Sequence, residues 1–233
     1  MKARTVHLAA TLALLPLVSA CSAASGTTAA QAGGSNTVTI KAEVWADNWF
    51  ALYSGDTLVG QDSVPITTER SFNSESFTFQ ASYPLHLNIV AKDYRANDTG
   101  LEYIGTAHQQ MGDGGLVAQF TDVATGRVIA VTDGTARVLV IHKAPLDKAC
   151  AQEANPVAGK APCTFLAVAE PAGWKSAAFD DSAWSRASVF TAAQVGPKEG
   201  YLDIGWNAAA HFIWGSDLFA DNTVLIRINV AAP

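Results

Sequence analysis

A two-residue alternation of apolar and polar side chains recurs along this chain and limits what it can fold into. Residues 38–44 place Val, Ile, Ala and Val at every second position, with Thr, Lys and Glu between them. Because successive side chains of a strand point to opposite faces, this pattern predicts a half-buried β-strand. Further strands are predicted within 50–53, 57–59, 74–81, 85–94, 115–122, 127–133, 136–143 and 222–230. Turn sequences such as Asp133-Gly134 separate them and no long stretch has helical periodicity, which favours an all-β sandwich or barrel.

The first 20 residues have the form of an export signal. Lys2 and Arg4 precede an apolar run, residues 8–18, that is too short to span a bilayer, which needs about 20 apolar residues. The sequence VSAC, residues 18–21, resembles the lipobox of bacterial lipoproteins. The resemblance implies that Cys21 is the first mature residue and carries lipid, and that Ser22 directs the protein to the outer membrane, facing the periplasm or the cell surface. An ordinary secretory signal is the alternative.

Residues 21–36 hold small and polar side chains and are interpreted as a flexible tether. The remaining residues, 37–233, suit one folded domain. The full chain has 15 basic and 21 acidic residues, a net charge of −6, and no basic run follows the signal. This balance argues against nucleic acid as a partner and leaves the N-terminal lipid as the predicted contact with the membrane.

Cys150 and Cys163 remain as a pair once Cys21 is set aside for lipidation. In an exported protein such a pair is expected to form a disulfide. Two free thiols are the alternative, and a metal site lacks partners because there is no histidine between residues 143 and 210. The pair lies in the irregular stretch 145–171, which is predicted to be a surface excursion.

Four stretches in order resemble the galactose-binding-like jelly roll, a carbohydrate-binding β-sandwich. They are ADNWFALYSGDTLVG at 46–60, HLNIVAKDY at 86–94, residues 115–140 ending in TDGTARVLV, and GWKSAAFDDSAW at 173–184 followed by residues 209–230. The resemblance implies a two-sheet jelly-roll sandwich with a glycan or another cell-envelope component as its ligand. Ala136 departs from the pattern, because the family usually has Trp there.

Adjacent carboxylates at Asp180 and Asp181 raise the question of catalysis. Glycoside hydrolysis needs two carboxylates on opposite sides of one bond, and adjacent side chains diverge. We therefore predict that one of them bonds backbone amides in a turn and that Trp184 is buried. No nucleophile elbow, phosphate-binding loop or zinc-protease motif is present. His86 and His142 alternate with apolar residues and are predicted to lie on the surface. No metal site is predicted, although a structural calcium, with Asp180, Asp181 and Ser182 as ligands, is left open.

Aromatic and planar polar side chains in loops are the candidates for ligand contact, since the strands are committed to packing. They are Trp49, Tyr94, Arg95, Asn97 and Trp206. The sequence thus predicts a lipid-anchored protein that is not an enzyme and binds a carbohydrate. The alternatives are a structural or adhesive envelope protein with a protein partner and, less favoured, a carbohydrate-active enzyme with an unrecognised site.

Overall fold

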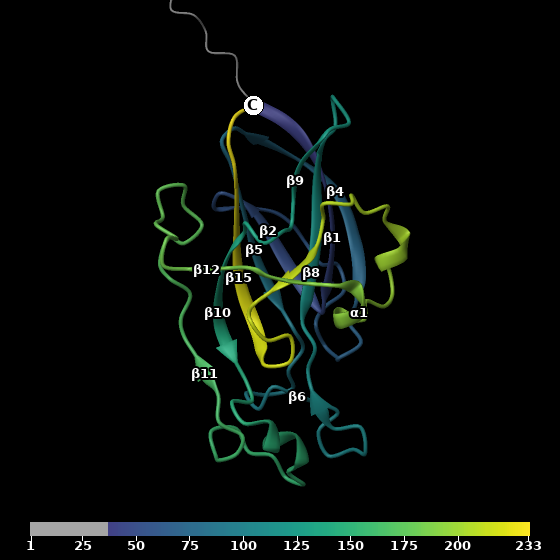
Figure 1. The fold of residues 1–233 in the computed structure, drawn as a ribbon, viewed down its shortest axis with the longest axis vertical. Helices are drawn as coiled ribbons and strands as arrows, with labels where there is room; N and C mark the ends of the chain where they lie inside the picture. The colour runs from purple at the N-terminus through teal and green to yellow at the C-terminus, as the bar shows by residue number, and fades with distance from the viewer. Residues whose placement is uncertain (1–36) are drawn as a thin grey trace, which may run out of the picture. The chain divides into compact units, whose positions relative to one another are not determined.

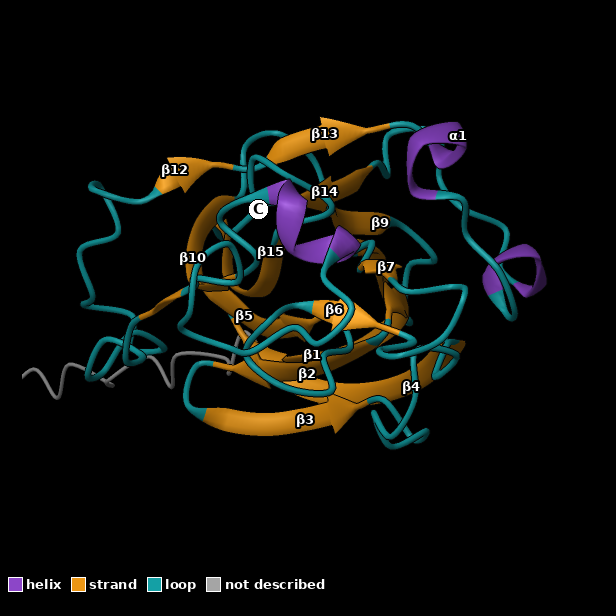
Figure 2. Ribbon diagram, turned by 90° about the horizontal axis from the view of Figure 1, so that it is seen from below, coloured by secondary structure: helices purple, strands orange, loops and turns teal. Residues whose placement is uncertain are grey.

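The computed structural model describes residues 37–233, which form two β-sheets layered face to face (Figures 1 and 2). The predicted signal peptide, the predicted lipidation at Cys21 and the predicted tether lie outside the described residues. The all-β, two-sheet sandwich predicted from the sequence is confirmed. The described residues 37–233 fall within one compact unit, Ser35–Pro233.

The first sheet has the strand order β13-β14-β8-β1-β4, with β9 also paired to β8. Its strands are β1 (Thr37–Asp47), β4 (Asn73–Ser82), β8 (Gly115–Asp122), β9 (Val128–Val131), β13 (Ser188–Phe190) and β14 (Phe212–Trp214). Every pairing is antiparallel. The predicted strands at 38–44, 74–81, 115–122 and 127–133 all lie here, whereas the short β13 and β14 were not predicted.

The second sheet has the order β11-β10-β15-β5-β2-β3, with β12 also paired to β10. Its strands are β2 (Trp49–Ser54), β3 (Thr57–Gln61), β5 (Leu85–Lys92), β10 (Arg137–Lys143), β11 (Leu166–Ala167), β12 (Ser185–Arg186) and β15 (Asp221–Val230). A separate ribbon pairs β6 (Leu101–Glu102) with β7 (Gln110–Met111). The helical segments are η1 (Lys148–Gln152), α1 (Ala192–Val195) and η2 (Tyr201–Asp203).

The core between the sheets follows from the alternation. Ile40, Ala42 and Val44 are fully buried, and they pack with the inward side chains of the other sheet, among them Ile89 and Ile226. Since burial of one such side chain stabilises the fold by about 1.5–3 kcal/mol, this face decides which side of each strand points inward.

Asp47 and Asn48 mark the point where the chain crosses from one sheet to the other. β1 ends at Asp47 in the first sheet and β2 begins at Trp49 in the second, with a cis peptide bond between Asp47 and Asn48. The Asn48 amide donates to the Lys92 carbonyl at 2.8 Å, which ties the crossing to the end of β5. The break expected here in the sequence is therefore a corner of the sandwich.

A second apolar cluster covers the outer face of the second sheet. Trp174 and Trp184 pack there against Val90 of β5 and Leu225 of β15, with Phe179 at the margin. The two tryptophans are 2% and 6% exposed, and their rings lie 5.9 Å apart. Because the segment around them caps this face, both faces of β15 are buried, which explains why Val224, Leu225 and Ile226 follow one another without a polar residue between them.

The excursion at 145–171 carries the predicted disulfide, which joins Cys150 to Cys163. Both cysteines are buried against Leu101 of β6. The stretch also holds η1 and β11, which the sequence did not predict. The surface position predicted for His142 is wrong, because the His142 ring is 4% exposed and stacks on Phe165 of the excursion, with 5.8 Å between ring centroids.

Candidate functional site

A cavity of about 350 Å³ lies at the end of the sandwich where β1 and β5 finish and β15 begins. This is the end opposite Thr37 and Pro233, and Figure 2 looks onto it. The residues that line the cavity are Ile66, Lys92, Asp93, Tyr94, Arg95, Ala96, Asn97 and Thr223. Most of them belong to one loop, so the shape of that loop decides what the cavity can accept.

Backbone and side-chain hydrogen bonds hold this loop in place. The Asp93 amide donates to the Asn222 carbonyl at 2.9 Å, and the Tyr94 amide donates to Asn48 Oδ1. Further along, Asn97 Oδ1 accepts from the Thr99 amide at 2.8 Å. Asx turns of this kind use the short Asn side chain to replace a backbone partner. The loop is therefore anchored at its start to Asn222 and Asn48 and held further along by its own Asx turn, before any ligand arrives.

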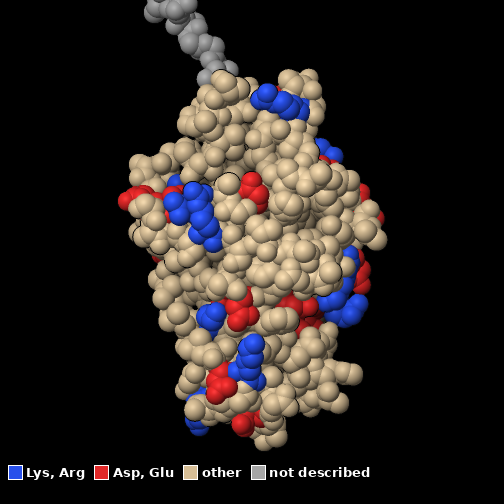
Figure 3. All heavy atoms as spheres, in the orientation of Figure 1, with Lys and Arg blue, Asp and Glu red and all other residues tan. Residues whose placement is uncertain are grey.

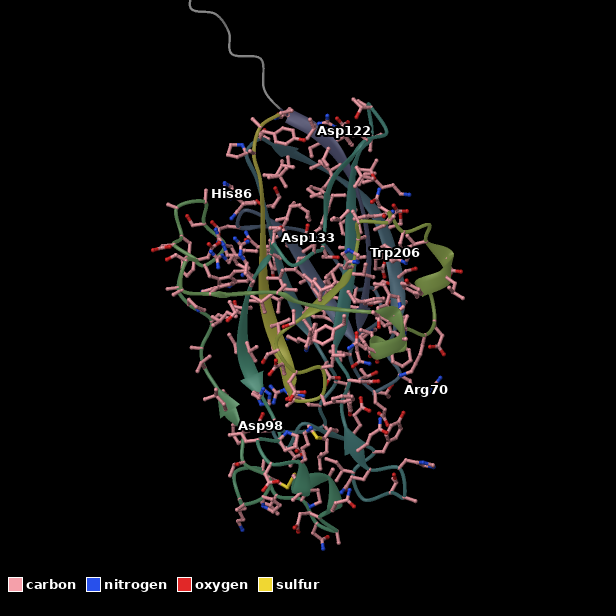
Figure 4. The ribbon with its side chains drawn as sticks, viewed as in Figure 1. Arg70, His86, Asp98, Asp122, Asp133 and Trp206 are labelled. Atoms are coloured by element: carbon pink, nitrogen blue, oxygen red, sulfur yellow. A yellow bond between two sulfur atoms is a disulfide. The ribbon has the colours of Figure 1, made fainter. Side chains whose placement is uncertain are left out.

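The cavity brings together three of the five residues predicted to contact a ligand: Tyr94, Arg95 and Asn97. Trp49 lies beside it, since Lys92, which lines the cavity, places its ammonium 5.0 Å from the Trp49 ring centroid. Trp206 lies elsewhere (Figure 4), stacked on Tyr201 and donating to the Tyr201 carbonyl. Tyr201 in turn contacts Trp45, whose position in β1 puts it on the outer face of the first sheet.

Charged side chains surround the loop. Arg95 pairs with Asp98, and Asp98 Oδ1 lies 3.2 Å from His142 Nε2. On its other side His142 Nδ1 lies 3.0 Å from Asn222 Oδ1, and Asn222 donates to Asp93 Oδ2 at 3.2 Å. Burial lowers the pKa of His142, although Asp98 and Asn222 oppose the shift. The loop and the buried sheet edge therefore share one polar network.

Four carboxylates lie next to this network, and they are named here the acidic cluster: Asp47, Asp93, Glu102 and Asp113. Asp47, Asp93 and Glu102 are each no more than 2% exposed. Neither carboxylate oxygen of Asp47 has a hydrogen-bond donor, and Asp93 Oδ1 lacks one as well, among the described residues. The sequence analysis did not single out any of the four. The signal in the sequence was an Asp at the end of one strand, Asp47, and an Asp directly after another, Asp93. The fold places both at one edge.

Burial and mutual repulsion favour the protonated forms of the acidic cluster. Desolvation, with Asp113 and Glu102 nearby, raises the pKa of Asp47 to about 8, although Lys198 opposes the shift. Desolvation also raises the pKa of Asp93 well above its usual range, with Glu102 and Asp47 contributing. Desolvation raises the pKa of Glu102 to about 7, and it also raises the pKa of Asp113. Such shifts mark carboxylates that lack a stabilising cation.

Both aspartates of the segment FDDS, residues 179–182, make contacts that stabilise the fold. Asp180 Oδ1 accepts from the Ser182 amide at 2.9 Å, the turn-capping bond predicted for one of the two aspartates, and Trp184 is buried. Asp181 Oδ2 accepts from Arg227 Nε at 2.8 Å. Since an arginine already neutralises Asp181, this segment does not suit the structural calcium that the sequence left open there.

Three broader features of the described residues bear on function: membrane-crossing helices, metal-binding groups and the distribution of surface charge. No helix among them is long and apolar enough to cross a membrane, and no three His, Cys, Asp or Glu side chains in 37–233 stand in a ready metal-binding arrangement. On the face drawn in Figure 3, basic and acidic side chains are interspersed.

Comparison with known proteins finds no matching family model, curated protein or solved structure. The likeness to galactose-binding-like domains therefore rests on the sequence stretches given above, and function has to be argued from the cavity itself.

Proposed function

We propose that this protein is a non-catalytic, lipid-anchored component of the bacterial cell envelope that binds a glycan in the cavity bounded by residues 92–97. The observation that carries the proposal is the gathering of Tyr94, Arg95 and Asn97 around one cavity of about 350 Å³. Small-molecule sites are concave, and a few placed polar groups fix the orientation of the ligand.

The side chains around the cavity suit a sugar. A pyranose ring has apolar C–H faces and a rim of hydroxyl groups. Tyr94 and Ile66 offer apolar surface, while Arg95, Asn97 and Lys92 offer planar amide or charged groups to hydroxyls or to an acidic substituent. The loop is pre-formed, which lowers the entropy cost of binding.

The position of the cavity suits an anchored protein. β1 runs from Thr37 to Asp47, and its length of 11 residues corresponds to about 35 Å at about 3.3 Å per residue. The cavity lies at the Asp47 end, whereas the proposed lipid on Cys21 would attach beyond the Thr37 end. The chain segment that leads to the proposed lipid therefore joins the domain at the end opposite the cavity.

A glycan array followed by titration calorimetry on the full chain tests the proposal. Tyr94→Ala should weaken binding of the best glycan about tenfold or more, because it removes the main apolar surface of the cavity. Trp206→Ala is the matched control, since it removes an aromatic side chain from a loop on the first sheet, away from the cavity, and should leave affinity unchanged once folding is verified. Absence of any glycan signal, or equal losses in the two variants, contradicts the proposal. Turnover of a glycan would contradict its non-catalytic part.

A protein partner is the second candidate, and one observation favours it. A depression of about 420 Å³ near α1 is lined by Phe190, Gln194, Ser216, Asp217, Leu218 and Phe219. Phe219, which lines the depression, is 49% exposed. An exposed apolar side chain beside such a depression is typical of contact surfaces. Capture of one envelope protein by the wild type but not by Phe219→Ser, with no glycan signal, would favour this function.

A further inference from the structure

We propose that three arginines on the outer face of the second sheet, Arg137, Arg186 and Arg227, form a binding pocket for a doubly charged phosphate group. The pocket is separate from the cavity bounded by residues 92–97 and does not depend on glycan binding there. Arg227 follows Thr223, which lines that cavity, by four residues along β15, or about 13 Å at about 3.3 Å per residue.

The pairing of neighbouring strands places the three arginines in one row. Arg137 of β10 is opposite Arg186 of β12 on one side and opposite Arg227 of β15 on the other (Figure 1). Directly opposite residues of an antiparallel pair lie on the same face of the sheet. That face is the outer one, because the next residues inward along the sequence, Val138 and Ile226, lie in the core between the sheets.

The three side chains line a pocket of about 240 Å³ together with Asp181. The Asp181 carboxylate is shared, since Oδ2 accepts from Arg227 Nε at 2.8 Å and Oδ1 lies 4.0 Å from Arg137 Nε. Within residues 37–233 the contact of the Arg186 guanidinium is a hydrogen bond to a backbone carbonyl and not an ion pair. Three guanidinium groups and one carboxylate therefore leave the pocket with two positive charges in excess.

Carboxylates that are close to the pocket in the sequence bind other groups. Asp133 Oδ1 accepts from the amide of Thr135 at 2.7 Å and also from its hydroxyl. Asp180 Oδ1 accepts from the Ser182 amide. Neither aspartate makes an ion pair with an arginine among the described residues, so they do not remove the excess charge.

This positive charge is permanent. A guanidinium stays protonated at any physiological pH, and like charges directly opposite in a sheet destabilise the pairing. Six arginines occur in residues 37–233 of a chain whose net charge is −6, and three of them line this one pocket. An anion taken up from solution would relieve the repulsion between them.

Two of the arginines have N–H groups available for a ligand. Arg137 Nη1 donates to the Trp184 carbonyl at 3.0 Å, and Arg186 Nη1 donates to the Thr135 carbonyl. These bonds hold both guanidinium groups in place, while the Nη2 group of each makes no hydrogen bond to the described residues. Arg227 donates to the fold through all three of its nitrogens, so its main contribution to the pocket is charge.

A phosphate group fits this pocket better than a carboxylate does. A phosphate monoester carries a charge of about −1.5 to −2 near neutral pH, which balances the excess of the pocket, whereas a carboxylate supplies one negative charge. Pairs of phosphate oxygens also accept forked hydrogen bonds from planar guanidinium groups. Inorganic phosphate and the phosphate ester of a sugar present the same chemistry, and the experiment has an arm for each.

Titration calorimetry and thermal unfolding of the full chain with inorganic phosphate at about pH 8 test the site, since phosphate is doubly charged there. One phosphate should bind per chain, and phosphate at about 100 times its Kd should raise the melting temperature by about 5–10 °C. Acetate at the same concentration and NaCl at matched ionic strength should give a much smaller shift. Tighter binding of glucose 6-phosphate than of inorganic phosphate supports a sugar ester as the ligand, and weaker binding supports the free ion.

Three variants locate the phosphate. Arg137→Gln and Arg186→Gln each remove a guanidinium with available N–H groups and should weaken phosphate binding about tenfold or more. Arg127→Gln is the matched control, because it changes the net charge equally at an exposed position between β8 and β9 of the first sheet, and it should keep the wild-type affinity. The melting temperature without phosphate verifies that each variant folds.

Three results would each overturn the proposal. The first is a phosphate response no larger than that of NaCl, and the second is an acetate affinity equal to the phosphate affinity. The third is the same phosphate affinity in Arg137→Gln and Arg186→Gln as in Arg127→Gln, because the loss would then follow net charge or be absent.

Discussion

Asp181 and Arg227 form a buried ion pair, with 2.8 Å between Asp181 Oδ2 and Arg227 Nε. The Arg227 side chain is 1% exposed, and its remaining N–H groups donate to the carbonyls of Trp174 and Ser176. The segment that covers the outer face of the second sheet is therefore fastened to β15 through one guanidinium. The acidic motif in the sequence serves the fold at this position.

Asp181→Ala should lower the free energy of unfolding by about 3 kcal/mol, because it leaves a buried guanidinium without its carboxylate. Urea unfolding followed by tryptophan fluorescence measures the change. Asp180→Ala is the control, since it removes only an exposed turn-capping bond and should lower stability much less. Glycan affinity should be the same in both. A loss of binding in Asp181→Ala at unchanged stability would assign the residue to function.

The disulfide should stabilise the excursion and, through it, the ribbon that carries Glu102. Its two cysteines are 13 residues apart, and closing a loop of that size contributes about 3 kcal/mol in the chain-entropy model. The double change Cys150→Ser with Cys163→Ser should lower stability by about that amount, measured by urea unfolding. Reduction of the wild type with dithiothreitol should reproduce the loss, while reduction of the double variant should have no effect.

Asp62 should make the domain less stable as pH rises from about 4 to about 7. Desolvation, with Glu75 nearby, raises its pKa from 3.8 to about 7, so in that window the folded state holds a proton that the unfolded chain releases. One such proton changes the free energy of unfolding by at most about 1.4 kcal/mol per pH unit. Asp62→Asn should flatten this part of the stability curve and melt higher than the wild type at pH 8. Parallel curves for the two proteins would contradict the expectation.

His142 should make the domain less stable at acidic pH. Because burial lowers its pKa below 6.5, the unfolded chain takes up a proton before the folded state does, and stability falls as pH drops through and below that value. His142→Gln should lose less stability than the wild type between pH 7 and pH 5 in thermal melts. The partly exposed His86, bonded to Asn229 Oδ1, gives the control His86→Gln, which should follow the wild type.

The long strands could be predicted from the sequence because each buries one face or both. The alternation at 38–44 lies within β1, and the strand predicted at 222–230 lies within β15. The short strands β11 to β14 could not be predicted, because two or three residues carry too little periodicity and pair only where the tertiary fold brings an edge to them. His142 was misassigned for a related reason, since the excursion that buries it is distant in sequence.

The candidate site was predictable only in part. Tyr94, Arg95 and Asn97 are close in the chain, so one loop was enough to predict them together. Trp206 could not be separated from them without the fold, because only the tertiary contacts show that its loop packs on the first sheet, where the Asn207 amide donates to Gln119 Oε1 of β8. The acidic cluster draws on four separate segments, and no local spacing joins them.

The sequence by itself determined the all-β class and the inward face of the long strands, because hydrophobic burial acts on each strand through its own residues. The pairing of Cys150 with Cys163, the only cysteines after Cys21, could be inferred as well. Only the tertiary structure decided that Asp181 serves Arg227, that His142 is buried, and that four carboxylates meet beside the cavity. Those outcomes depend on electrostatics and desolvation between residues far apart in the chain, and these terms take their values only once the two sheets are packed together.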